Sequence, residues 1–177
     1  MVECGFYVLK NDFFIIVKEL GGERDSLAGD RRPVYCCIKD DIVEGLYWAI
    51  PTSPLGDKMP HQIQRYKQYM SFPDWDLRSS YYHLAKSNLE AVYNVSACFP
   101  FTEKYVSHPF TAEGAHVILR RKRDVAIIEK KLRKILAFEL KKNNYFNQRI
   151  TDIKSYLVRE LKIENISTKN SENGLDR

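Results

Sequence analysis

The chain has 177 residues, of which 44% are hydrophobic and 12% aromatic, and its formal net charge is +5. This length and apolar content are typical of one globular domain and exclude a chain that is disordered throughout. No apolar run approaches the roughly 20 residues that cross a bilayer, and the N-terminus lacks the order of a signal peptide, so we expect a cytoplasmic protein without membrane contact.

The first part of the chain alternates between strand and helix patterns. Residues 5–9 predict a short strand, and residues 12–20 predict a helix that ends at two glycines. Residues 34–38 are rich in strand-forming types, and residues 46–50 predict the strand that returns after a turn. We therefore expect these last two segments to form an antiparallel hairpin.

Two prolines flank a pair of hydroxyl residues at the end of the second hairpin strand. Proline has no N–H for a sheet ladder, so Pro51 and Pro54 are predicted to end the strand. Thr52 and Ser53 would then be fixed where the backbone leaves the sheet. An ordinary strand-to-helix turn with surface hydroxyls explains the same spacing, and this interpretation stays open.

Cations are predicted close to these hydroxyls. Lys58 follows at the start of a helix predicted over residues 59–72, where an ammonium group and a helix N-terminus would suit a phosphate. An antiparallel hairpin also places the start of its first strand beside the end of its second. Arg31 and Arg32 are therefore expected near the Thr-Ser pair.

The second part of the chain predicts more strands and then two helices. Strand patterns recur at residues 81–84, 91–95, 99–102, 105–106 and 116–119. Because it contains Pro100, the third of these is expected only at an edge or as a connection. Apolar residues at three- and four-residue steps predict helices over residues 124–142 and 150–161. We expect residues 1–163 to form one α+β domain and residues 164–177 a frayed polar tail.

Positive charge gathers in the region of the two C-terminal helices. Residues 116–162 hold 14 lysines and arginines against 5 acidic residues, a net charge of +9. Lys130, Lys134 and Lys141 fall on the side opposite the apolar stripe. A polyanion is therefore the expected partner of these basic helices.

The residue patterns of several other chemistries are missing from the sequence. The four histidines do not have the spacing of a metal site, the four cysteines form no C-x-x-C pair, and the glycines form no phosphate-binding loop. We therefore predict reduced cysteines and neither a metal nor a cofactor. What remains is a basic, tyrosine-rich chain with hydroxyls and cations at one end of a hairpin.

These groups suit RNA cleavage by attack of a ribose 2′-hydroxyl on the adjacent phosphate. One group must remove a proton from the 2′-hydroxyl, another must protonate the leaving 5′-oxygen, and positive charge must stabilise the phosphorane. Lys58 and the arginine pair suit the third role. Tyr35, Tyr82 and Tyr93 are candidates for stacking on splayed bases, although a half-buried sheet position explains each of them as well.

Several short motifs occur in a recognisable order between residues 5 and 160. In chain order they are Phe6-Tyr7-Val8-Leu9, Arg32-Pro33-Val34-Tyr35, Ile50-Pro51-Thr52-Ser53-Pro54, Tyr82-His83 and Phe99-Pro100-Phe101-Thr102-Glu103-Lys104-Tyr105-Val106. In this order the chain resembles the toxins of type III toxin-antitoxin systems, the ToxN/AbiQ family, and more closely its CptN-like branch. The lysine that closely follows the Thr-Ser pair in the family is displaced here to Lys58.

The resemblance implies a compact α+β fold with a strongly bent antiparallel sheet, similar to the Kid/MazF architecture, and C-terminal basic helices. It implies a metal-independent, sequence-specific endoribonuclease that leaves a 2′,3′-cyclic phosphate. It also implies an RNA antitoxin that folds into a pseudoknot, which the toxin processes and then binds in a closed protein–RNA assembly. Such toxins block growth or abort phage infection.

The resemblance also assigns roles to residues. Thr52 and Ser53 match the family's catalytic pair and would orient the 2′-hydroxyl and the scissile phosphate, with Ser53 the stronger candidate. The arginine pair would bind phosphate, and Lys58 would stabilise charge or act as the acid. His83 is the histidine best suited to proton transfer, because the ordinary histidine pKa of about 6.5 lies near neutrality. A structural histidine on a strand explains the same residue.

Two other classes of protein stay open. A non-catalytic RNA-binding module would hold a structured RNA with its basic helices and use the Thr-Ser stretch only to contact the backbone. A protein-binding module would carry the same charges as an ordinary solvated helix face. Cleavage of RNA in EDTA would indicate the enzyme, and salt-sensitive retention without cleavage would indicate the binding module.

Overall fold

The structure is a computed structural model that describes residues 1–22 and 35–173, with side chains described up to residue 164 except that of Tyr35. In these residues the chain has an α+β fold in which helices pack on a 7-stranded, open antiparallel sheet. Arg31 and Arg32 lie outside the described residues. None of the described helices combines the length and apolarity needed to cross a bilayer.

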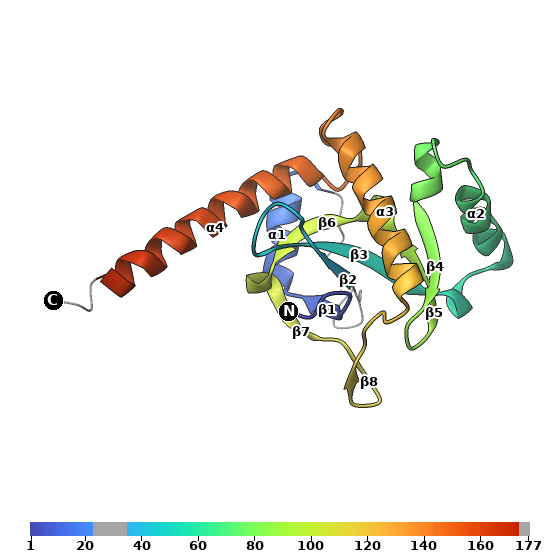
Figure 1. The fold of residues 1–177 in the computed structure, drawn as a ribbon, viewed down its shortest axis with the longest axis horizontal. Helices are drawn as coiled ribbons and strands as arrows, with labels where there is room; N and C mark the ends of the chain where they lie inside the picture. Colours follow the sequence, from blue (N-terminus) through green and yellow to red (C-terminus); the bar gives the residue numbers. More distant parts are fainter. Residues whose placement is uncertain (23–34, 174–177) are drawn as a thin grey trace.

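The sheet strands follow one another in the order β4-β5-β3-β2-β1-β7, and β6 also pairs with β3 (Figure 1). The strands are β1 (Phe6–Leu9), β2 (Tyr35–Lys39), β3 (Leu46–Pro54), β4 (Tyr82–Lys86), β5 (Glu90–Asn94), β6 (Phe99–Thr102) and β7 (Val106–Pro109). The helices are α1 (Asn11–Glu19), α2 (Pro60–Met70), α3 (Lys122–Glu139) and α4 (Ile150–Asn173). The predicted hairpin of β2 and β3 is confirmed, as are all four predicted helices.

Strand β3 is the centre of the sheet, and it is longer than the sequence predicted. It continues through Pro51 to Pro54, so the expectation that Pro51 ends the strand is wrong. One edge of β3 pairs with β2, while the other edge pairs with β6 as far as Ala49 and with β5 from Thr52 onward. Pro51 lies in the interval between the β6 and β5 ladders, so its missing N–H interrupts neither of them.

Two hydrophobic cores lie on opposite faces of the sheet. On one face, α3 packs Ile128, Leu132 and Ile135 against Trp48 and Tyr93. On the other face, α1 and the first turns of α4 form the second core (Figure 1). The members of this core include Phe13, Val17, Ile153 and Leu157. The strand alternation of β2 divides adjacent Cys36 and Cys37 between the two cores, and all four cysteines are buried.

Helix α2 packs against β4 through aromatic contacts at the end of the sheet away from α4 (Figure 1). The ring of Tyr82 lies 4.8 Å from the ring of Tyr66 and 5.4 Å from that of Tyr69. These contacts place α2 on the face of β4 that carries Tyr82. Since neighbouring strand residues point to opposite faces, His83 belongs to the other face.

The segment after β7 differs from the prediction that residues 116–119 complete the sheet. It folds back on itself as a small ribbon of β8 (Thr111–Ala112) and β9 (Ala115–His116). The two residues of its turn, Glu113 and Gly114, have positive φ angles of 52° and 78°. Two left-handed residues form the tight turn that suits a two-residue hairpin, so the segment pairs locally. An isolated bridge joins Ile118 to Gly5, and the Phe6 N–H of β1 donates to the backbone oxygen of Val117 at 3.0 Å, so the segment still touches the edge of the main sheet.

The remaining boundaries are close to those predicted. β6 pairs with β3 alone and contains Pro100, so the expected edge position is confirmed. Helix α4 continues as a helical backbone to Asn173, past the predicted domain boundary at residue 163. In Figure 1 the C-terminal part of α4 extends away from the sheet. The division into residues 1–163 and 164–177 stays a prediction.

Candidate functional site

Three polar residues, Thr52, Tyr93 and His83, form one row across the sheet. Thr52 of β3 pairs with Tyr93 of β5, and Tyr93 pairs with His83 of β4. Residues directly opposite each other in antiparallel strands have their side chains on the same face. Thr52 and His83 therefore lie on the same face of the sheet, on either side of Tyr93, and this is the face that α3 covers.

The two hydroxyl residues do not share this face. Ser53 pairs with Val92, and Val92 pairs with Leu84, which makes a second row beside the first. Because β3 stays extended as far as Pro54, Thr52 and Ser53 alternate to opposite faces. Both are half-buried. Only Thr52 of the predicted pair joins the row of His83.

Asp124 of α3 contacts the histidine of the row. His83 Nε2 lies 3.1 Å from Asp124 Oδ1, and both residues are buried. Asp124 lies in the first turn of α3, where the helix dipole favours a carboxylate. Burial lowers the pKa of His83, and the hydrogen bond to Asp124 opposes that shift. Above its lowered pKa His83 is neutral, so one ring nitrogen can donate and the other can accept.

Four consecutive cations precede Asp124 and were not singled out from the sequence. Arg120, Arg121, Lys122 and Arg123 are all exposed at the start of α3. Arg121 Nη1 lies 3.7 Å from Asp124 Oδ2. The positive end of the helix dipole disfavours cations at this end, so the run opposes the stability of α3. An anion bound here would relieve that repulsion, and the signal in the sequence is the run itself.

Lys131 is a further residue that the sequence interpretation missed. It lies on α3, and its ammonium group donates to the backbone oxygen of Tyr82, which precedes His83 on β4. Burial lowers the pKa of Lys131 to about 8, while Asp74 raises it and Lys134 lowers it. A lysine with this pKa can release a proton near neutral pH, which an ordinary lysine does not.

Lys58 is not joined to the row by any contact. It follows the short helix η2 (Leu55–Asp57) and is half-buried. Its side chain forms no hydrogen bond or ion pair with any of the described residues, and its backbone N–H donates to Leu55 O at 3.0 Å. The structure therefore leaves its predicted role as acid or charge stabiliser without support from contacts.

The three tyrosines considered for base stacking lie in different surroundings. Tyr93 is fully buried at 0% exposure, so the stacking interpretation is wrong for it, and it is a core residue rather than the half-buried sheet residue of the alternative interpretation. Tyr82 is half-buried and packs on the rings of α2. The backbone of Tyr35 pairs with Tyr7 and with Pro51, and its side chain lies outside the described part of the chain.

Of the three predicted RNA-binding lysines, Lys130 and Lys134 lie on α3 outside its buried stripe and have a protein partner, and Lys141 follows the helix. Lys130 and Lys134 both form ion pairs with Asp74, which lies before the short helix η3 (Leu77–Ser80). Lys141 is exposed, and it forms no ion pair within the described residues. Asp74 neutralises part of this surface, and the pKa of its carboxyl is lowered by Lys130 and then by Lys134.

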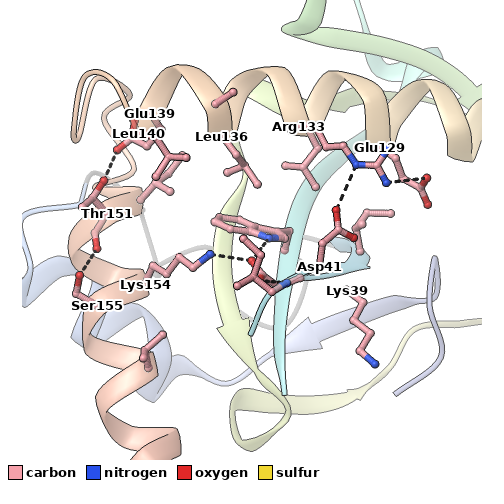
Figure 2. A pocket seen from close by; sticks show the side chains of 18 of the residues that line it. Lys39, Asp41, Glu129, Arg133, Leu136, Glu139, Leu140, Thr151, Lys154 and Ser155 are labelled. Carbon is pink, nitrogen blue, oxygen red and sulfur yellow. Dashed lines mark hydrogen bonds and ion pairs between the residues drawn. The ribbon is translucent and has the colours of Figure 1, made fainter. Parts of the chain in front are cut away.

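A cavity of about 710 Å³ lies elsewhere, between α3, α4 and the β2–β3 hairpin (Figure 2). None of the predicted catalytic residues lines it. Several polar side chains in its wall already have protein partners: Lys154 donates to Asp40, Arg133 donates to Asp41, and Thr151 donates to Glu139. Figure 2 shows Leu136 and Leu140 on the α3 side of this space. The cavity therefore offers apolar surface rather than the groups that RNA cleavage requires.

Comparison with known proteins adds no family to this description. Neither the family models nor the curated proteins contain a match to this chain. In the described residues, no group of three or more histidine, cysteine, aspartate or glutamate side chains is placed to hold a metal ion. The fold and site define the chain as an α+β protein with an open antiparallel sheet, a buried His-Asp pair and a basic helix start.

Proposed function

We propose that the chain is an endoribonuclease that cleaves RNA by attack of a ribose 2′-hydroxyl on the adjacent phosphate. The observation that carries the proposal is the contact of His83 with Asp124 in the row that also holds Thr52, directly beside the exposed cations of residues 120–123. This combination brings a titratable group, a hydroxyl and positive charge to one face of the sheet. Those are the groups that the reaction needs.

In the proposed reaction His83 acts as the base. When Nε2 carries the ring proton, its N–H donates a hydrogen bond to Asp124. Nδ1 is then left as an acceptor for the proton of the 2′-hydroxyl. The 2′-oxygen then forms a bond to phosphorus, and the bond from phosphorus to the 5′-oxygen breaks. The products are a 2′,3′-cyclic phosphate and a 5′-hydroxyl, so the reaction consumes no water and requires no metal to generate a nucleophile.

The other groups of this face would stabilise charge and supply a proton. The cations at residues 120–123 and the hydroxyl of Thr52 would interact with the phosphorane oxygens, whose charge increases in the transition state. Lys131, with a pKa of about 8, is the candidate acid for the leaving 5′-oxygen. Ser53 and Lys58 would contact the RNA backbone from the other face.

The wider proposal is that the chain is the toxin of a type III toxin-antitoxin system, with a Kid/MazF-like bent sheet and basic C-terminal helices. It would act in the cytoplasm and would be inhibited by a pseudoknot RNA that it processes and binds in a closed assembly. The support is the order of motifs that resembles the ToxN/AbiQ family and the positive charge of residues 116–162. A bound RNA would also reduce the repulsion between the cations of residues 120–123 and the positive end of the α3 dipole.

The test is incubation of the purified protein with single-stranded RNA in excess EDTA, followed by analysis of the product ends. The proposal predicts fragments that end in a 2′,3′-cyclic phosphate and begin with a 5′-hydroxyl. A control RNA in which every ribose is 2′-O-methylated should stay intact, because it lacks the nucleophile. Cleavage of that control, or 3′-hydroxyl ends on the products, would contradict the proposal.

The second candidate function is a non-catalytic RNA-binding module. One observation favours it: the side chain of His83 keeps only 11% of its exposure, which limits the access of a ribose to the ring. In this case His83 and Asp124 would join β4 to α3 as a structural pair, and the cations would bind phosphates alone. Retention of intact RNA that weakens with salt, without any cleavage, would establish this function instead.

A further inference from the structure

Trp75 is the most exposed aromatic residue among the described residues, and its environment differs from that of the other tryptophan. Trp75 is 86% exposed, while Trp48 is 2% exposed in the core. Removing an indole from water is favourable, so leaving one in water forgoes stability. The exposed ring of Trp75 is therefore available to a partner that covers it.

A hollow adjoins this tryptophan on the surface. It measures about 300 Å³, which is at the lower end of the range of ligand pockets. Its walls include apolar Trp75, Leu77 and Phe138 and cationic Lys141. Lys134 and Asp74 also line it, and they form an ion pair with each other. A flat apolar group that carries negative charge beside it would suit these walls.

Contacts to α3 connect the tryptophan loop with the helix. The ammonium groups of Lys130 and Lys134 both reach Asp74, the residue that precedes Trp75, and Lys134 also donates to the Asp74 backbone oxygen. These contacts hold the loop against the helix from two successive turns. The indole is therefore presented from an anchored position, although the ring itself remains in water.

Cations of α3 form a stripe that runs from the start of the helix to the tryptophan. Arg123, Lys130 and Lys134 are seven and four residues apart, close to whole turns of 3.6 residues, so they lie on one side of the helix. The distance along the axis from Arg123 to Lys134 is about 16 Å at 1.5 Å per residue. Arg123 directly precedes Asp124 in the chain, and Lys134 lines the hollow.

We infer that single-stranded RNA lies along this stripe and that one splayed base stacks on Trp75 in the hollow. This rests on the proposed function and adds a binding position away from the scissile phosphate. Stacking on an aromatic ring accepts any base, and lysines next to the ring bind the flanking phosphates. Lys134 and Lys141 both line the hollow and would supply those cations.

The experiment uses the fact that the chain has two tryptophans, of which only Trp75 is exposed. The probe is a 2′-O-methylated RNA oligonucleotide of mixed sequence, which the proposed reaction cannot cut. Its binding should quench the exposed part of the tryptophan emission and protect it from acrylamide. An abasic oligonucleotide of the same length should bind more weakly and should leave the emission of Trp75 unchanged.

Variants separate stacking from charge. Trp75→Leu should abolish the quenching and weaken binding by about 5- to 140-fold, the equivalent of about 1–3 kcal/mol per stacked base. Trp75→Phe should restore most of the affinity because it keeps an aromatic face. Ile42→Ala, at a residue that is 88% exposed beside the other cavity, should bind as the wild type does.

Two results would overturn the inference. One is unchanged affinity in Trp75→Leu, and the other is equal binding of the abasic and base-carrying oligonucleotides, which would leave this surface to a protein partner. Failure of the inference is distinguishable from failure of the proposed function. If Trp75→Leu binds and cleaves RNA in EDTA as the wild type does, only the inference is overturned. If binding depends on Trp75 but the wild type does not cleave, only the proposed nuclease activity is overturned.

Discussion

His83 Nε2 lies 3.1 Å from Asp124 Oδ1, and this contact joins β4 to the first turn of α3. The two residues are 41 positions apart in the sequence. Burial favours the neutral imidazole, while the carboxylate favours the charged one, and the net effect lowers the pKa of His83. The pair is therefore suited to accept a proton, because the imidazole is neutral at physiological pH.

The first prediction concerns stability against pH. His83 has a lowered pKa in the folded state, so its contribution to stability is fully present above the unfolded value of about 6.5. As the pH falls below that value, the unfolded chain binds the proton first, and the free energy of unfolding decreases until the folded pKa is passed. Urea unfolding between pH about 8 and about 5 should show a smaller loss for His83→Asn than for the wild type.

The matched control for this measurement is His61→Asn, since His61 is exposed on α2. It should lose stability over this pH range just as the wild type does. If His83→Asn also followed the wild-type curve, His83 would titrate with an ordinary pKa. The account of a neutral, buried imidazole would then be wrong.

The second prediction concerns Asp40, which joins the hairpin to α4. Its carboxylate accepts from Trp48 Nε1 at 2.8 Å, from Lys154 Nζ at 2.9 Å, and from the N–H groups of Ile42 and Val43. Burial alone would raise the pKa of Asp40, but Lys154 and these N–H groups outweigh it and lower the pKa. Asp40→Asn should therefore destabilise the fold by about 1–3 kcal/mol at neutral pH in chemical denaturation.

The stability difference between Asp40→Asn and the wild type should depend on pH. Because the folded pKa of Asp40 is lowered, its stabilisation is present above the unfolded pKa and disappears as the pH falls through the folded pKa. The difference between Asp40→Asn and the wild type should therefore shrink below about pH 4. Asp57→Asn, at an exposed position, should change stability little at any pH. A difference that grows in acid would contradict this explanation.

The third prediction concerns the cations at the start of α3. Affinity for single-stranded RNA should fall with salt by about 0.7 log units per decade for each phosphate contact. Arg120→Gln and Arg123→Gln should each weaken binding and reduce the slope by about this amount. Lys18→Gln, an exposed cation on α1 at the other side of the sheet, should leave the slope unchanged. If the salt slopes of Arg120→Gln and Arg123→Gln equalled that of the wild type, as expected for Lys18→Gln, RNA contact at the start of α3 would be excluded.

The fourth prediction concerns Lys131 as the proton donor. With a pKa of about 8, its loss of a proton should reduce the single-turnover cleavage rate at alkaline pH. Lys131→Arg should cleave more slowly but should lose this alkaline decline, because the guanidinium stays protonated. Lys130→Arg is the control and should keep the wild-type pH profile. A wild-type profile in Lys131→Arg would remove Lys131 from the mechanism.

Local pattern predicted most of the elements, while long-range pairing decided the differences. The apolar repeat of α3 was readable because Ile128, Leu132 and Ile135 recur at helical spacing and are buried. The strand end at Pro51 was not, because a proline interrupts a ladder only where a partner strand needs its N–H. No residue near Pro51 reveals that β6 and β5 follow each other along that edge of β3.

The residues of the candidate site also differ in whether local sequence could predict them. Thr52 and Ser53 were predicted from the flanking prolines and the motif order, and His83 from the motif order and the ordinary histidine pKa, because all of these can be read locally. Asp124 and Lys131 were not found, because their importance depends on the packing of α3 onto β4. The separation of Thr52 from Ser53 follows from β3 being longer than predicted, which only the pairing with β5 determines.

The most direct test of the central claim is the single-turnover rate of RNA cleavage in EDTA for folded Thr52→Ala, His83→Asn and Ser53→Ala. If the face that carries His83 is the active one, the first two variants should each lose about 100-fold or more in rate. Ser53→Ala should lose less, and His61→Asn should cleave as the wild type does. Wild-type rates in Thr52→Ala and His83→Asn, with complete loss in Ser53→Ala, would contradict the account and assign the active site to the opposite face.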